Sequence, residues 1–176
     1  VYLNMSSKEE FDFEVSGNAD VIVEGDLEAT LSAGKDLVLY AKANSLFQVN
    51  GDLSLSNSGG SGKALIHADG GHGTFEINGN LTLSSTAAYR EVEVRVDKNN
   101  NVVDVRRNIL MAAEAEGTVA VNLNAKSNLY LGGNIVRSSP SAYGSFSMAT
   151  GATLTLNGTT QVQQLVSDKP TTNGSD

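Results

Sequence analysis

The sequence predicts an all-β protein, a right-handed parallel β-helix (solenoid) of about six coils with a period near 27 residues. Three observations carry this prediction. A glycine-centred stretch, "FQVNGDLSL" at residues 47–55, recurs at nearly constant spacing; apolar and polar residues alternate on both sides of each glycine; and turn-forming Gly, Ser and Asn are abundant while aromatic residues make up only 6%. Repetition on this length scale is the sequence signature of a solenoid.

One residue at the centre of each copy marks the repeat, and successive markers are 25 to 28 residues apart. The markers are Gly25, Gly51, Gly79, Arg107, Gly133 and Gly158. Positions two and four before the marker are apolar in every copy, and the intervening positions are mostly polar. This alternation predicts strands with one buried face. Asp or Asn follows the marker in five of the six copies, so we expect these side chains to hydrogen-bond along the stack, beside a glycine that lets the chain bend without a Cβ in the way.

A second strand is predicted before each marker-containing strand. In most copies three alternating apolar residues identify it, such as Leu37, Leu39 and Ala41. The segment "ALIHADGGHGT" fits poorly, because either Leu65 and His67 or the alternate residues face inward. We expect the second arrangement, with Ala64, Ile66 and Ala68 inside, because a neutral histidine in a core needs a hydrogen-bond partner.

Short Asn- and Gly-rich turns join the two strands, and these residue types tolerate positive φ. A longer and variable loop, such as "SNSGGSGK" or "SSPSAY", is predicted after the marker-containing strand. The solenoid is expected to span residues 11–166. Residues 1–10 are expected to form a remnant coil or a cap, and residues 167–176 a polar tail or linker.

Two other folds share part of this pattern. Leucine-rich repeats have a similar period, but they carry a helix-like return and are dominated by Leu, whereas both halves of this repeat alternate strictly and prefer Val, Ile and Phe. A β-sandwich of hairpins predicts no column-wise identity at constant spacing. The parallel β-helix explains the columns.

Composition restricts the partners. Twenty acidic residues against twelve basic ones leave a net charge of −8, which disfavours nucleic acid because phosphate binding needs clustered Lys and Arg. The one basic group, Arg95, Lys98, Arg106 and Arg107, is interpreted as a solvated patch. The chain has no cysteine, which excludes disulfides and thiolate chemistry. No apolar run approaches the length of a membrane span, so an integral membrane segment is not expected.

Repeats such as "FQVNGDLSL" and "FEINGNLTL", the acidic charge, the missing cysteine and the Ser-, Gly-, Asn- and Thr-rich loops resemble the β-helical passenger regions of Gram-negative autotransporters and filamentous-haemagglutinin-type secreted adhesins. The resemblance covers residues 11–166. It implies a secreted or surface-displayed stalk or adhesin, attached to the outer membrane through parts outside these residues. Its implied partners are a host-surface protein or glycan, or other copies of the chain.

Two groups of residues have the chemistry of metal ligands. His67, Asp69 and His72 lie in one glycine-rich turn, with side chains that suit zinc or another divalent ion. Adjacent coils also bring together acidic side chains, Glu24, Asp26 and Asp52, that suit calcium. Neither group has a complete ligand set or a known calcium-loop spacing, so we expect solvated side chains, no metal and no cofactor.

One group has the chemistry of a glycosidase. Glu76 and Asp104 occupy the same column in adjacent coils, with Arg106 beside them, a spacing that suits a retaining carboxylate pair. The simpler interpretation is an outward ion pair, so no catalytic residue is assigned, and the ligand-binding residues are not identified by the sequence.

The function predicted is a non-enzymatic segment of a secreted or surface-displayed bacterial adhesin or stalk, acting in attachment or self-association through its faces and variable loops. Two alternatives stay open. One is a polysaccharide-degrading β-helix enzyme, a lyase or glycosidase, and the other is a self-assembling structural module.

Overall fold

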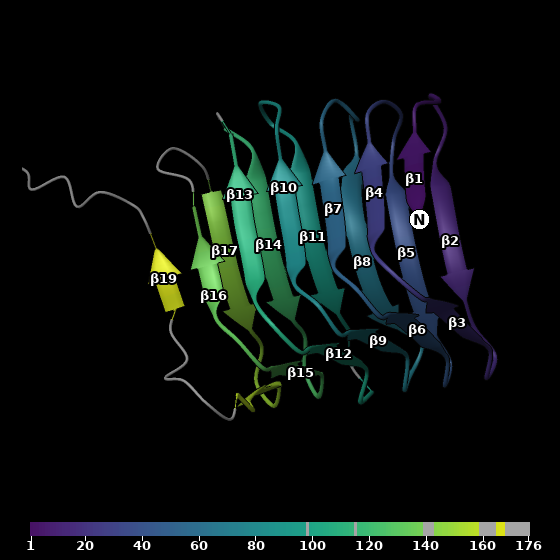
Figure 1. The fold of residues 1–176 in the computed structure, drawn as a ribbon, viewed down its shortest axis with the longest axis vertical. Coiled ribbons are helices and arrows are strands. Elements are labelled where there is room, and N and C mark those ends of the chain that lie inside the picture. Colours follow the sequence, from purple (N-terminus) through teal and green to yellow (C-terminus); the bar gives the residue numbers. More distant parts are fainter. Residues whose placement is uncertain (98, 115, 139–142, 159–164, 168–176) are drawn as a thin grey trace, which may run out of the picture.

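The computed structural model describes residues 1–97, 99–114, 116–138, 143–158 and 165–167. Within these residues the regular structure consists of strands without a helix, and the strands form three sheets in which every pair is parallel (Figure 1). The order of strands in each sheet follows the order of the chain, with every third strand in the same sheet. The predicted parallel β-solenoid is therefore confirmed.

Each sheet receives one strand from each coil. Sheet A contains β1 (Tyr2–Met5), β4 (Leu27–Leu31), β7 (Leu53–Asn57), β10 (Leu81–Ser85), β13 (Ile109–Ala113), β16 (Ile135–Arg137) and β19 (Leu165–Ser167). Sheet B contains β2 (Phe11–Val15), β5 (Leu37–Lys42), β8 (Lys63–Asp69), β11 (Glu91–Val96), β14 (Thr118–Leu123) and β17 (Tyr143–Met148). Sheet C contains β3 (Asp20–Val23), β6 (Leu46–Val49), β9 (Thr74–Ile77), β12 (Val102–Val105), β15 (Asn128–Leu131) and β18 (Thr153–Leu156).

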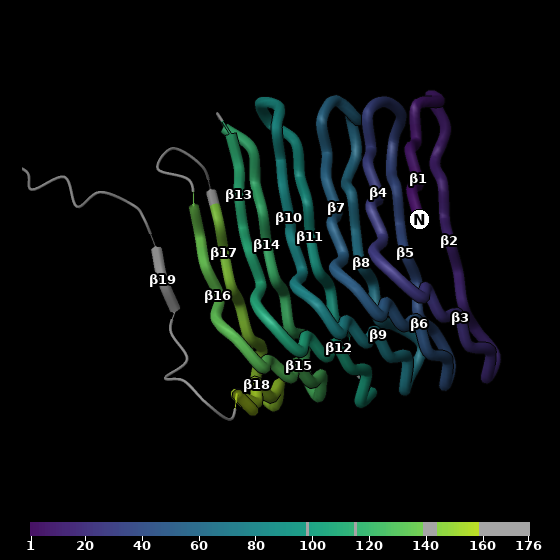
Figure 2. Tube along the Cα trace, viewed as in Figure 1, coloured from purple at the N-terminus to yellow at the C-terminus, as the bar shows by residue number. Residues whose placement is uncertain are grey.

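Strands β2 to β16 form five successive coils, and β17 to β19 add one strand to each sheet beyond them. The chain runs along sheet B, crosses through the short strands of sheet C and returns along sheet A (Figure 2). Sheets A and B thus form the long sides of the cross-section, and sheet C closes one end of it (Figure 1).

The strand register follows the predicted columns. Phe47 pairs with Val21 on one side and with Phe75 on the other, and Leu53 pairs with Leu27 and Leu81. The stretch "FQVNGDLSL" is therefore part of a coil and not a hairpin. The alignment follows because a parallel ladder that shifts by one residue would turn every apolar side chain to the outside.

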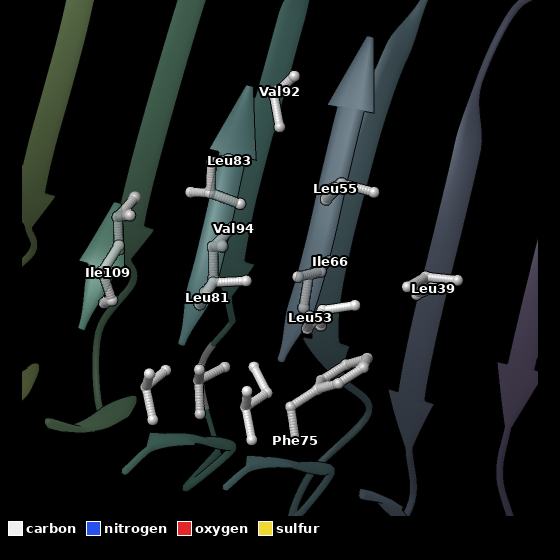
Figure 3. Packing of buried hydrophobic residues seen from close by; sticks show 14 of the residues in the cluster. Leu39, Leu53, Leu55, Ile66, Phe75, Leu81, Leu83, Val92, Val94 and Ile109 are labelled. Carbon is white, nitrogen blue, oxygen red and sulfur yellow. The ribbon is translucent and has the colours of Figure 1, made fainter. Parts of the chain in front are cut away.

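The core is a set of stacked columns between the three sheets (Figure 3). The Phe47 and Phe75 rings stack with centroids 5.1 Å apart, and Phe13 meets Phe47 edge-on at 5.5 Å. Burying one such side chain fully contributes about 1.5–3 kcal/mol. In β8, Ala64, Ile66 and Ala68 belong to this core, as predicted, while Leu65 and His67 lie on the outer face.

A side-chain ladder follows the corner between sheets C and A. Its members are Asp26, Asp52, Asn80, Asn108 and Asn134. The Oδ1 atom of each of the first four accepts a hydrogen bond from the main-chain N–H of the next, at 2.8, 2.7, 3.2 and 2.9 Å in order. The expected stacking of this column is thereby confirmed, and we call it the corner ladder.

The corner ladder leaves no room for a Cβ at the marker positions 51 and 79. A Cβ on Gly51 would lie 2.1 Å from Oδ1 of Asp26, and a Cβ on Gly79 would lie 2.2 Å from Oδ1 of Asp52. Neither glycine has a positive φ, so space for the neighbouring carboxylate, and not backbone conformation, selects glycine here. The longest ladder bond, 3.2 Å to Asn108, is in the coil where Arg107 replaces the glycine.

Positive φ values occur instead in the turns between sheets B and C, as predicted. The non-glycine residues there are Asn18, Ala43, Asn44, His72, Asn99, Asn100 and Lys126. The turns after β8 and β11 each contain one residue more than the turn after β5, so Ala68 pairs with Val96 before these turns and Thr74 pairs with Val102 after them. This shared lengthening explains why "ALIHADGGHGT" fits the simple period poorly.

Three of the loops from sheet A to sheet B are more uniform in length than the expected variable, decorated edge. Residues 32–36, 58–62 and 86–90 connect their strands over equal lengths. Two fully buried polar side chains fix the second and third of these loops: Asn57 donates to the carbonyl oxygen of Gly62, and Ser85 donates to that of Arg90. "SSPSAY" lies mostly outside the described residues.

Within the described residues, β1, β2 and β3 are the end strands of the three sheets and pair on one side only. β1 joins sheet A by pairing with β4, and the amino group of Val1 donates to the carbonyl oxygen of Asp26 at 2.6 Å. A cavity of about 360 Å³ opens here, lined by residues that include Tyr2, Leu3 and Phe11. Residues 168–176, the main part of the expected polar tail, lie outside the described residues.

Candidate functional site

The outer face of sheet B carries side chains that change from coil to coil. Its central row, which we call the central row of sheet B, consists of Glu14, Tyr40, His67, Arg95, Asn122 and Ser147 in successive strands. The parallel register places each of these beside the next, because neighbouring strands are about 4.8 Å apart. Residues far apart in the sequence therefore form one continuous polar strip.

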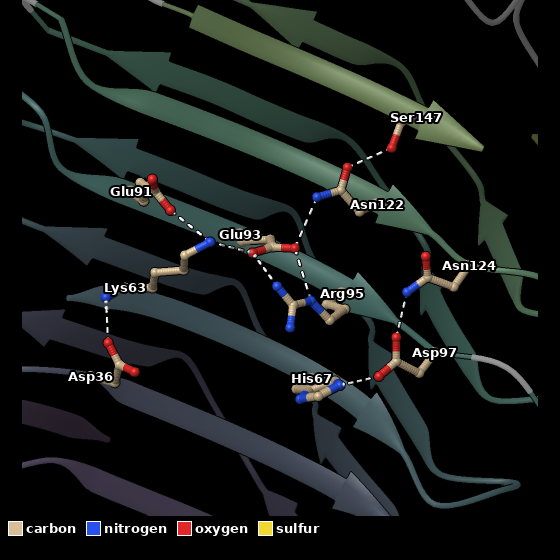
Figure 4. A network of polar contacts seen from close by, with 10 residues as sticks. All are labelled: Asp36, Lys63, His67, Glu91, Glu93, Arg95, Asp97, Asn122, Asn124 and Ser147. Carbon is tan, nitrogen blue, oxygen red and sulfur yellow. Dashed lines mark hydrogen bonds and ion pairs between the residues drawn. The ribbon is translucent and has the colours of Figure 1, made fainter. Parts of the chain in front are cut away.

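Glu93 is the centre of a hydrogen-bonded network on this face (Figure 4). Glu93 is only 4% exposed, and its carboxylate accepts two hydrogen bonds from the guanidinium of Arg95, both at 3.0 Å. The Asn122 amide donates a third at 2.8 Å, and the ammonium of Lys63 lies 3.4 Å away. Lys63 also forms an ion pair with Glu91 at 2.7 Å, and the hydroxyl of Ser147 donates a hydrogen bond to Asn122. The network therefore links the side chains of four neighbouring strands.

The electrostatics of this network keep Glu93 ionised. Burial alone would raise the pKa of Glu93, but hydrogen bonds from Arg95 and Asn122, with the charges of Arg95 and Lys63, hold it below its ordinary value. The hydrogen bond to Glu91 raises the pKa of Lys63. A buried carboxylate with several charge-assisted partners has little freedom to move, so this part of the face is ordered in advance of any binding.

A second group on the same face surrounds His67. Nε2 of His67 lies 2.7 Å from Oδ2 of Asp97, and the ring packs against Tyr40 with centroids 5.1 Å apart. Asn124 donates from Nδ2 to Oδ1 of Asp97. Burial would raise the pKa of Asp97, but the bonds from His67 and Asn124 lower it. Asp69 completes the group, because the ligand atoms of His67, Asp69 and Asp97 all lie within 4.8 Å of one another.

The sequence grouped His67 and Asp69 with His72. In the structure His72 is exposed, has a φ of 59° and sits in the turn with its N–H bonded to the carbonyl oxygen of Asn99. The third potential ligand is Asp97 from the next coil. Side chains meet here through the stacking of coils, and proximity in the sequence is misleading.

On sheet C the predicted trio is brought together. Glu76 and Asp104 pair in register, and Nη2 of Arg106 lies 3.3 Å from Glu76 and 3.2 Å from Asp104. Burial raises the pKa of Asp104, the charge of Arg106 opposes this, and Glu76 adds to it. Oδ1 of Asp104 is buried without a hydrogen-bond partner among the described residues. The arrangement is an ion-paired trio with one perturbed carboxyl group.

The acidic residues considered for calcium lie along the corner ladder. Asp26 and Asp52 each accept a main-chain N–H from the following coil, and Glu24 accepts a hydrogen bond from Asn50 at 2.8 Å. Their carboxylates thus stabilise the bend between sheets C and A.

The predicted basic patch is divided among separate places. The guanidinium of Arg95 binds Glu93 on sheet B, and that of Arg106 binds the sheet C trio. Arg107 is exposed at the corner, and Lys98 lies outside the described residues.

Sequence reasoning missed the network around Glu93. The strand "EVEVRV" showed three valines facing inward, and aligning its outer residues with those of neighbouring coils would have placed Lys63, Glu91, Glu93 and Asn122 side by side. Equivalent positions in neighbouring coils thus carried residues of complementary charge or hydrogen-bonding capacity, and a comparison that looks for identical residues does not detect them.

Comparisons with protein-family models, with curated proteins and with solved structures found no match to this chain. No helix able to cross a membrane is present among the described residues.

Proposed function

We propose that this chain is a non-enzymatic segment of a secreted or surface-displayed bacterial adhesin or stalk, and that it binds its partner through the outer face of sheet B. The observation that carries the proposal is a difference between two columns of side chains that run along the solenoid. The corner ladder repeats one interaction in every coil, whereas the central row of sheet B carries a different side chain in each strand.

Three features of this face support a binding role. It is continuous across neighbouring coils, it mixes carboxylates, amides, a guanidinium and an ammonium, and its side chains are already held by hydrogen bonds across strands. A surface ordered in this way loses little conformational entropy on association. Its polar groups suit a glycan or a polar protein surface. Three of the loops from sheet A to sheet B, by contrast, are equal in length, with five residues each.

A binding screen against immobilised glycans and extracellular-matrix proteins tests the proposal. Asn122→Ala alters the sheet B face, and Gln48→Ala, on the outer face of sheet C, is the matched control. We expect Asn122→Ala to weaken binding to the selected partner by about tenfold, equal to about 1.4 kcal/mol, while Gln48→Ala leaves it unchanged. Equal losses in both variants, or no binding by the wild type, would contradict the assignment.

A second candidate is a polysaccharide-degrading enzyme, favoured by the raised pKa of Asp104 beside Glu76. A carboxyl group whose pKa is raised beside a second carboxylate suits a general acid. Depolymerisation of a glycan that disappears in Asp104→Asn would support this function, and the absence of turnover on a broad polysaccharide panel would exclude it.

A third candidate is self-assembly, favoured by the N-terminal end. Tyr2, Phe11 and Ile22 are 60%, 40% and 52% exposed on β1, β2 and β3, which pair on one side only within the part of the chain that the structure describes. Open strand edges with apolar neighbours promote association. Sedimentation that depends on concentration, and that decreases in Phe11→Lys, would support this candidate.

A further inference from the structure

We infer that the outer face of sheet B holds a divalent transition-metal site, with His67, Asp69 and Asp97 as its ligands and zinc as the ion that suits them best. The inference is independent of the proposed adhesive function. It rests on a juxtaposition made by two adjacent coils: the first two ligands come from β8, and the third follows β11 in the next coil.

The geometry brings three different strand positions to one point. His67 and Asp69 are two residues apart on one strand, so both project from the same face. Asp97 lies directly after Val96, which pairs with Ala68, and it is therefore beside Asp69. One ligand atom from each of the three residues lies within 4.8 Å of the other two.

The ligand chemistry fits zinc. An imidazole nitrogen and two carboxylate oxygens bind Zn²⁺ at about 2.0–2.2 Å, and three protein ligands leave one position for water or a partner group. Nε2 of His67 and Oδ2 of Asp97 are 2.7 Å apart, so an ion would replace the proton shared between them after a small rotation of the carboxylate. Asn124 already orients Asp97, in the manner of an outer-shell hydrogen bond.

The surroundings favour a cation at this point. The carboxylate of Asp69 has no hydrogen-bond or ion-pair partner among the described residues, so it is available to a cation. The two neighbouring cations act on these carboxylates only through space, because Lys42 lies 2.8 Å from Glu14 and over the Tyr40 ring, and Arg95 is hydrogen-bonded to Glu93. His67 is 8% exposed, with its Nδ1 buried and without a partner among the described residues. Its ring is thus fixed by packing with Nε2 directed at Asp97.

Calorimetric titration of the chelator-treated protein with ZnCl₂, with Co²⁺ absorption as a second readout, tests the site. We expect one saturable Zn²⁺ per chain and the visible bands of four-coordinate Co²⁺. Asp69→Asn and Asp97→Asn should each weaken binding by more than about tenfold, and Asn124→Ala by about tenfold through loss of orientation. Asp69→Asn is the safest variant for folding, because its side chain has no described partner.

His72→Gln is the matched control, since it removes the other imidazole of the same segment from an exposed turn. It should bind Zn²⁺ as the wild type does. The inference is overturned if the wild type shows no saturable binding, if binding survives Asp69→Asn and Asp97→Asn, or if His72→Gln abolishes it.

Discussion

The corner ladder and the outer face of sheet B are built on the same parallel register but use it in opposite ways. At the corner each coil repeats an Asp or Asn side chain, and the interaction joins this side chain to the next main-chain N–H. On sheet B each coil supplies a different residue, and the interactions join side chains to one another. The repeated column determines the shape, whereas the column that varies determines what the surface recognises.

The largest effect is expected from filling the space that the corner ladder needs. In Gly79→Ala the new Cβ would lie 2.2 Å from Oδ1 of Asp52 and 2.5 Å from the carbonyl oxygen of Gly51. Because one of these atoms belongs to the backbone, we expect the free energy of unfolding to fall by about 2–4 kcal/mol in urea titrations.

Gly25→Ala is the control for this substitution, since a Cβ at Gly25 would have no atom within 4 Å. It should leave stability unchanged or raise it by up to about 1 kcal/mol. Equal losses at the two positions would show that backbone conformation, and not the ladder, selects the marker glycines.

A smaller effect is expected from Glu93 on the sheet B face. Glu93→Gln should lower the free energy of unfolding by about 1–3 kcal/mol at pH 7, because Arg95 and Lys63 lose a buried charged partner. The pKa of Glu93 is lower in the folded protein than its ordinary value of 4.5, so its contribution is complete above that pH and is lost as the pH falls through the folded value. The pKa of Asp97 is also lowered in the folded protein, so its contribution to stability is likewise lost as the pH falls.

Acid titration of unfolding separates this contribution from that of sheet C. Glu93→Gln should flatten the loss of stability below about pH 4.5. Asp104 has a raised pKa, which costs stability at neutral pH and returns it as the pH falls, so Asp104→Asn should raise stability slightly at pH 7 and steepen the acid loss. Parallel pH profiles for wild type and both variants would contradict these electrostatic assignments.

The smallest effect is expected where the ladder is interrupted. Arg107→Gly should shorten the 3.2 Å bond from the Asn108 N–H to Oδ1 of Asn80, because it removes the Cβ from the marker position. The stability gained from the shorter hydrogen bond is offset by the larger backbone entropy of glycine in the unfolded chain. The free energy of unfolding should therefore change by less than about 1 kcal/mol. Amide hydrogen exchange at Asn108 should slow several-fold, and unchanged exchange would show that Arg107 does not loosen the ladder.

Most of the fold follows from the sequence because a column of similar residues is visible without coordinates. Phe47 and Phe75 occupy equivalent positions in two copies, and the structure pairs them directly. The inward direction of Ala64, Ile66 and Ala68 followed from the cost of burying an unpaired imidazole. His67 is nevertheless buried, because outer neighbours such as Tyr40 and Asp97 cover it, and a rule about the core alone does not reveal that.

The site was predicted less well. The trio on sheet C was found because Glu76 and Asp104 occupy one column. Asp97 was not predicted as the partner of His67, because the predicted ligand group contained only residues of one turn, and His72 is closer to His67 in the sequence. The equal loops from sheet A to sheet B were also missed, because Asn57 and Ser85 fix Gly- and Ser-rich segments whose composition suggests mobility.

The strand pairs all join one coil to the next, and this has a mechanical consequence. The stability of such a stack is approximately a sum of units coupled to their neighbours, so folding spreads from an inner coil and fraying begins at the ends. Tension along the axis passes through the coils in series. We therefore expect the stack to part first at a junction with few side-chain links, and not between the third and fourth coils, which the pairs Lys63–Glu91, His67–Asp97 and Arg106–Glu76 join.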